Sequence, residues 1–81
     1  MMTKEEVLAG LKEVLSVIRP ATDLTGVSYE TELSRGLGVD SLSMLLLALA
    51  TEEKFGMKFP DGVAMPTTVG EVCDAVLKAL S

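Results

Sequence analysis

Three stretches of this chain carry apolar residues at helical spacing, and each begins with a residue that can cap a helix. Thr3 and Glu6 have the spacing of a capping box, in which each side chain bonds the backbone N–H group of the other residue. Pro20 ends the first stretch because proline cannot continue a helix. We therefore predict a first helix over residues 4–19. Its apolar face is Val7, Leu8, Leu11, Val14, Leu15 and Ile18.

The other two stretches predict two further helices. Asp40 can cap a helix that runs to about Phe55, where Gly56 has the position that glycine favours after a helix. Thr68 and Glu71 repeat the capping-box spacing ahead of the last stretch. The apolar face of this last helix is Val69, Val72, Cys73, Val76, Leu77 and Leu80.

Residues 20–39 form a long connection, which in so small a domain is either functional or packed by its own side chains. We expect Val27, Leu33 and Leu37 to anchor it on the core. Val63–Met65 can form one short helical turn. The predicted fold is therefore all-α: a small three- to four-helix bundle with a long loop between the first and second main helices. The 81 residues are enough for one such domain.

Composition excludes several classes of function. The net charge is −5 and there is no basic run, so we expect no nucleic-acid binding. The chain has no histidine and no glycine-rich phosphate loop, and its acids are scattered, so we expect neither a catalytic nor a metal site. Cys73 fits a core position better than that of a reactive thiol. Without a signal peptide or a long apolar segment, we expect a cytoplasmic monomer that does not insert into membranes.

Ser41 follows Asp40 at the predicted start of the second helix. Both residue types favour helix caps, so a capping role by itself can explain the pair. A serine in the first turn also has its hydroxyl near free backbone N–H groups and the positive end of the helix dipole, which favours a phosphate group. Without a histidine as base, Ser41 is better placed to receive a phosphodiester from another enzyme than to attack a substrate itself.

The motif at residues 37–42, Leu-Gly-Val-Asp-Ser-Leu, resembles the Leu-Gly-x-Asp-Ser-Leu motif of acyl carrier proteins. The resemblance covers almost the whole chain and implies a bundle of acyl-carrier-protein type, with residues 1–81 as a single acyl carrier domain. Beyond the motif, the matching positions are Glu52, Glu53, Phe55, Gly56, Pro60, Asp61, Thr67, Thr68, Val69 and Gly70.

The resemblance implies a carrier and not an enzyme. Ser41 would be joined through a phosphodiester to 4′-phosphopantetheine, which a Mg²⁺-dependent phosphopantetheinyl transferase takes from coenzyme A. The arm ends in a thiol that carries acyl groups as thioesters. Asp40 would help the transferase to place its metal and substrate. The partners implied are this transferase and the acyl-transferring and synthase enzymes of fatty acid, polyketide or related specialised lipid biosynthesis.

Three places depart from the family pattern, and each lacks an acid that is common there. Arg35 and Gly36 occupy the positions before Leu-Gly, where the family often has an acid. Ser43 and Leu46 lie two and five residues after Ser41, where acids are also common. The start of the second helix has therefore lost the negative charge that is usual in the family.

Other classes of protein stay open at this point. One is a peptidyl or aminoacyl carrier of nonribosomal synthesis, although such carriers more often have histidine where this chain has Asp40. A D-alanyl carrier is another. An unmodified helical adaptor, in which Ser41 only caps a helix, belongs to a different class. Addition of mass by a transferase and coenzyme A separates the adaptor from the carriers.

The second helix is apolar almost all the way round, so its two sides have to be assigned by angle. At 100° per residue, the side that we expect to face the core holds Met44, Ala48, Thr51 and Phe55. The opposite side, which we expect to face solvent and to bind partner enzymes, holds Leu42, Leu46, Leu49 and Glu53. A charged rim is expected from Glu52, Glu53 and either Glu30 or Glu32.

An attached acyl chain needs an apolar space. We expect it to be buried partly between the second helix and the segment Met57–Met65. Met44 and Met65 are the candidate gap-fillers, because methionine adapts to irregular spaces.

Overall fold

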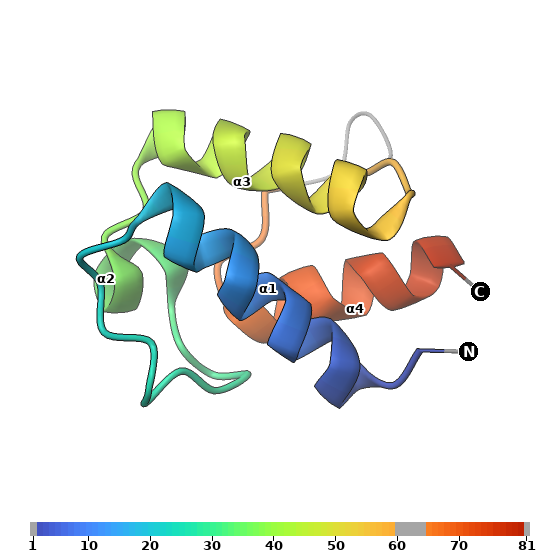
Figure 1. Ribbon diagram of the computed structural model, residues 1–81, viewed down its shortest axis with the longest axis horizontal. Coiled ribbons are helices and arrows are strands. Elements are labelled where there is room, and N and C mark those ends of the chain that lie inside the picture. The colour runs from blue at the N-terminus through green and yellow to red at the C-terminus, as the bar shows by residue number, and fades with distance from the viewer. Residues whose placement is uncertain (1, 60–64, 81) are drawn as a thin grey trace.

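The computed structural model describes residues 2–59 and 65–80, which form four helices. They are α1 (Lys4–Ile18), α2 (Leu33–Leu37), α3 (Ser41–Phe55) and α4 (Val69–Leu80). α1 packs against both α3 and α4, and α2 lies at the end of the bundle where α3 begins (Figure 1). The predicted all-α bundle with a long loop after the first helix is confirmed. The turn predicted at Val63–Met65 falls mainly on residues 60–64, outside the described residues.

The helix ends follow the local signals in the sequence with one exception. Thr3 and Glu6 form the predicted reciprocal capping box at the start of α1. At α4, Thr68 Oγ1 accepts from the Glu71 N–H at 3.2 Å, as predicted. The Glu71 carboxylate accepts its shortest hydrogen bonds from the N–H and hydroxyl of Thr67, at 2.8 and 2.9 Å. The Thr68 N–H, which the capping box predicts as the donor, makes a smaller contribution to the lowered pKa of this carboxyl.

The core lies where α1, α3 and α4 meet. Val7, Leu11 and Leu15 of α1 are buried against the α4 face that contains Val72 and Val76. Two surface ion pairs join the same helices, Lys4 with Asp74 and Lys54 with Glu13. Exposed pairs of this kind contribute about 0–1 kcal/mol each, so apolar burial holds the bundle together.

The long loop is fixed to the start of α4, and this fixes α2. The N–H groups of Leu33, Val69 and Gly70 donate to the carbonyls of Thr67, Thr31 and Tyr29 at 2.8–2.9 Å. The predicted anchors Val27, Leu33 and Leu37 are all buried, which confirms that prediction. Leu33 and Leu37 lie one turn apart on the short helix α2, which the sequence did not reveal. These hydrogen bonds and buried side chains therefore hold the backbone that leads into α3.

The predicted core face of α3 is partly wrong. Thr51 is fully buried, as expected, and its Oγ1 donates to the Leu47 carbonyl at 2.6 Å. The other buried residues are Ser43 and Leu47, so the buried line runs one residue earlier than the predicted line of Met44 and Ala48. Met44, Ala48 and Phe55 are only half-buried. Because apolar residues surround this helix, only packing against the core residues of α1, α2 and α4 around Leu47 decides which line is covered.

We predict that Gly70→Ala destabilises the protein by about 1–3 kcal/mol, the usual range for overpacking. A Cβ atom at Gly70 would lie 2.8 Å from the backbone oxygen of Tyr29, which is held by the Gly70 N–H. Gly26→Ala is the matched control, because a Cβ there meets nothing within 4 Å. Urea unfolding of both variants measures the free energies. Equal stabilities would show that the loop yields to the added methyl group.

Candidate functional site

Ser41 is the first residue of α3 and is exposed. Asp40 caps the helix, and its Oδ1 accepts from the Ser43 N–H at 2.8 Å, while its carbonyl accepts from the Met44 N–H. The predicted cap is therefore confirmed. The Ser41 hydroxyl makes no hydrogen bond within the described part of the chain. This side chain therefore has no structural role there.

Two backbone donors beside Ser41 are open. Asp40 occupies the third and fourth N–H groups of α3, but the N–H groups of Ser41 and Leu42 donate no hydrogen bond to any described residue. Unpaired donors at the positive end of a helix suit an anion. This donor set fits a phosphodiester on the Ser41 oxygen.

Asp40 is poorly suited to act as a base for Ser41. The hydrogen bond from Ser43 lowers the pKa of its carboxyl, and the positive charge of Arg19 acts in the same direction. A carboxylate that is held in its ionised form accepts a proton weakly. The sequence has no histidine to take this part. Neither Asp40 nor a histidine is therefore available as a strong base beside Ser41.

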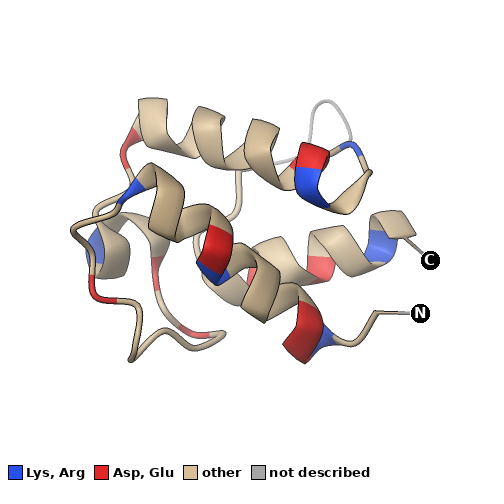
Figure 2. Ribbon diagram, viewed as in Figure 1, with Lys and Arg blue, Asp and Glu red and all other residues tan. Residues whose placement is uncertain are grey.

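The solvent-facing side of α3 is apolar from its first turn to Leu49. Leu42, Leu45, Leu46 and Leu49 are 67%, 56%, 46% and 55% exposed, and we call these four residues the α3 apolar surface. Figure 2 shows this helix uncharged until its last turns. The predicted exposure of Leu42, Leu46 and Leu49 is confirmed. Leu45 was missed, although it follows Ser41 by four residues and so lies one turn along the helix from it.

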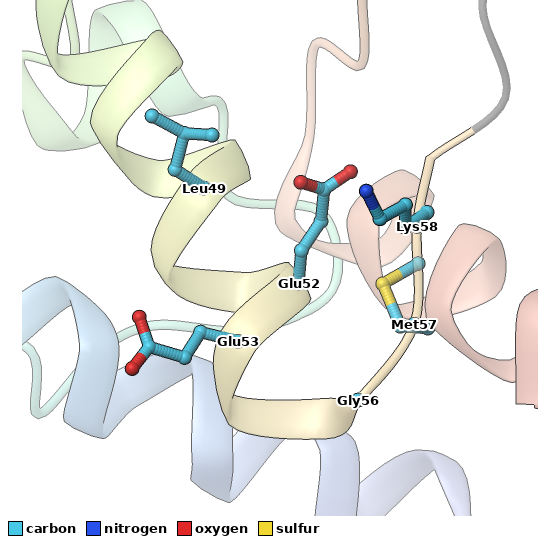
Figure 3. Close-up of a pocket in the computed structure, with 6 residues that line it drawn as sticks. All are labelled: Leu49, Glu52, Glu53, Gly56, Met57 and Lys58. Carbon is cyan, nitrogen blue, oxygen red and sulfur yellow. The ribbon is translucent and has the colours of Figure 1, made fainter.

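A hollow of about 470 Å³ lies at the far end of α3 from Ser41. In Figure 3 the Lys58 side chain points toward Glu52, while Glu53 lies on the other side of the helix. Glu52 also accepts from the Phe59 N–H at 2.9 Å, which holds the segment after α3 in place. Glu53 is exposed beside the α3 apolar surface. The hollow is lined by Leu49, Glu52, Glu53, Gly56, Met57 and Lys58.

The core beneath α3 is closed. A small apolar gap there has no room for a water molecule, and it is lined by Leu11, Leu15, Leu33, Leu47, Val69 and Val72. Met44 is half-buried and fits the predicted role of gap-filler. Met65 is 62% exposed, so that part of the prediction is wrong. Met65 lies just after the undescribed residues 60–64, outside the packed helices.

The remaining chemical candidates give no second site. Cys73 is fully buried, and this burial raises the pKa of its thiol to about 11, so it is a core residue and not a nucleophile at neutral pH. Among residues 2–59 and 65–80 no three acidic or cysteine side chains gather as metal ligands. Within the same residues no helix is both long and apolar enough to cross a membrane.

Comparison with known proteins shows which proteins this sequence is similar to. A family model described as "Phosphopantetheine attachment site" matches residues 5–76. An acyl carrier protein of Acidothermus cellulolyticus is 40% identical over an alignment of 81 positions, which covers 96% of this chain and 93% of that protein. A meromycolate extension acyl carrier protein of Mycolicibacterium smegmatis is 38% identical over 94% of this chain and 77% of its own length. An acyl carrier protein of Myxococcus xanthus is 39% identical over 75% of this chain and 76% of its own.

Proposed function

The chain belongs to the acyl carrier protein family, and we propose that Ser41 carries its covalent 4′-phosphopantetheine. The protein is a carrier and not an enzyme: the thiol of the arm holds acyl groups as thioesters while the chain supplies position and recognition. The observation behind the choice of Ser41 is its geometry. Its hydroxyl is exposed at the start of α3 beside two open backbone donors.

Attachment of the arm needs a second protein. A phosphopantetheinyl transferase would bind coenzyme A and Mg²⁺, and the Ser41 oxygen would attack the phosphorus next to the pantetheine. The bond to the departing adenosine bisphosphate breaks, and the serine proton passes to a base of the transferase, since Asp40 is held ionised. Asp40 would contribute its negative charge to the transferase metal. We propose residues 1–81 as one acyl carrier domain that acts in the cytoplasm as a monomer.

Mass spectrometry tests this function directly. Incubation with coenzyme A, Mg²⁺ and a broad-specificity transferase is expected to add one phosphopantetheine per chain, and fragmentation is expected to place it on Ser41. The loaded thiol is then expected to accept an acyl group that hydroxylamine removes, as it does from a thioester. A chain that gains no mass with any transferase would contradict the proposal and favour an unmodified adaptor.

The partner enzymes are expected to dock on the α3 apolar surface. It begins directly after Ser41, so a partner that covers it has the arm at its edge. The relative from Mycolicibacterium smegmatis is named for meromycolate extension, which supports partners from fatty acid or related specialised lipid biosynthesis. We place Glu53 at the rim of this surface. Glu52 and either Glu30 or Glu32 complete the proposed rim, and the Glu52 carboxylate also accepts a hydrogen bond from the Phe59 N–H.

A long acyl chain on the arm is expected to enter the space between α3 and the segment that starts at Met57. Each buried methylene contributes about 0.8 kcal/mol, and a hollow beside Leu49 and Met57 opens between α3 and this segment. Methyl NMR spectra of the long-chain form should therefore shift at these two residues and at Leu47 beneath them. The acetyl form is the control and should not shift there. Shifts limited to the surface around Ser41 would show that the chain stays outside.

A further inference from the structure

Arg19 has a fixed backbone and a side chain directed at the attachment end of the molecule. It caps the C-terminus of α1, where its N–H donates to the Leu15 carbonyl at 2.7 Å and its own carbonyl accepts from the Thr22 N–H at 3.0 Å. Pro20 follows and restricts the chain further. The C-terminus of α1, α2 and the N-terminus of α3 meet at one end of the bundle (Figure 1). The side chain of Arg19 therefore starts from a rigid position beside the residues that lead to Ser41.

The guanidinium of Arg19 lies against Gly38. A Cβ atom at Gly38 would be 3.0 Å from Nη2 and 3.8 Å from Cζ of Arg19, so the absence of a side chain makes room for the guanidinium. Gly38 also has φ of +67°, a backbone conformation that favours glycine. Ser41 is three residues further on, at most about 11 Å away along an extended chain. The guanidinium thus lies beside the segment that leads into Ser41.

No acid of the described chain pairs with Arg19. Its side chain is half-buried, and no carboxylate among the described residues lies within 4 Å of its nitrogens. The nearest candidate, Asp40, gives its Oδ1 to the Ser43 N–H. Arg19 still acts on Asp40 over a longer distance, since its charge contributes to the lowered pKa of that carboxyl. Arg19 therefore offers a positive charge and several N–H donors beside Gly38, at the same end of the bundle as Ser41.

We propose that Arg19 is a positioning residue for the arm: its guanidinium, seated on Gly38, forms an ion pair with the phosphodiester on Ser41. This inference rests on the proposed attachment at Ser41. The phosphodiester adds a negative charge next to Asp40, and a cation beside both offsets their repulsion. Guanidinium donors also match phosphate oxygens in geometry. The ion pair would limit the range of directions in which the arm leaves Ser41.

Four holo proteins test this proposal. Wild type, Arg19→Gln, Arg19→Lys and Arg35→Gln are loaded with phosphopantetheine, and a mass spectrum confirms each product. Arg35→Gln is the matched control, because Arg35 lies on α2 at the same end but its side chain is 86% exposed and faces Glu32 at 3.9 Å. The readout is the ³¹P NMR shift of the phosphodiester between low and high salt. Circular dichroism confirms that each variant is folded.

Wild type and Arg35→Gln are expected to show a ³¹P shift that moves as salt screens the ion pair. In Arg19→Gln the ³¹P shift at low salt is expected to equal the wild-type shift at high salt. Added salt is expected to leave the ³¹P shift of this variant unchanged. Arg19→Lys keeps a cation without the planar donors and is expected to retain part of the response. The same response in all four proteins would overturn the proposal, as would an equal loss in Arg35→Gln and Arg19→Gln. Failure of wild type to load would instead contradict the attachment at Ser41.

Discussion

Ser41→Ala is expected to lose all phosphopantetheine loading and to remain folded. The substitution removes the only oxygen at this position that can form the phosphodiester. The side chain is exposed and makes no hydrogen bond to a described residue, so the free energy of unfolding should change by less than about 0.5 kcal/mol. Intact-mass measurement after incubation with coenzyme A, Mg²⁺ and transferase gives the loading, and urea unfolding gives the stability.

Two nearby variants separate attachment from the local fold. Ser43→Ala removes the next hydroxyl of the same turn, which is buried, and is expected to load as wild type does. Asp40→Asn keeps a side chain that caps helices well but removes the charge. It is expected to load more slowly, because the transferase metal loses a negative neighbour, and to be slightly less stable at neutral pH, because the ionised Asp40 favours the fold. Loading of Ser41→Ala would show that the arm is attached elsewhere, and normal loading of Asp40→Asn would remove Asp40 from recognition.

Leu46→Glu is expected to weaken binding to the cognate synthase by about tenfold or more. Leu46 is 46% exposed at the centre of the α3 apolar surface. Covering a whole leucine contributes about 1.5–3 kcal/mol, so the exposed half contributes about 1 kcal/mol, and a carboxylate against an apolar partner adds a desolvation cost. A loss of about 1.4 kcal/mol is a factor of ten in Kd. Isothermal titration with the holo form measures this change.

The controls distinguish apolar docking from charge. Leu46→Gln removes the apolar contact without adding a charge and is expected to weaken binding by a smaller factor, about fivefold for the loss of about 1 kcal/mol. Leu80→Glu places the same charge on α4, at a leucine that is 40% exposed, and is expected to bind as wild type does. The wild-type affinity should change little between low and high salt, since few charges lie on this surface. Unchanged binding in Leu46→Glu, or binding that is lost in salt, would mean that partners dock elsewhere.

Local signals were enough to predict most of the helix ends. The capping box of Thr3 and Glu6 predicts the start of α1, and Asp40 predicts the start of α3. Both helices begin at the predicted residues, because a cap acts on the first turn that follows it. The carrier motif likewise lies within six consecutive residues. α2 could not be predicted in this way because five residues are too few for a periodic pattern. Its stability comes from burying Leu33 and Leu37 and from hydrogen bonds between the loop and the start of α4.

The sequence by itself determined the all-α class, the cap at Asp40 and the place of Ser41 at the start of a helix, because these depend on neighbours along the chain. The tertiary structure alone decided which line of α3 is buried. Apolar residues lie all round that helix, so the sequence gives no preferred side, and the core residues of α1, α2 and α4 around Leu47 supply it. It also decided that Leu45 joins the exposed surface. The contact between Arg19 and Gly38 joins residues 19 positions apart, and only the packing of α1 beside α2 and α3 brings them together.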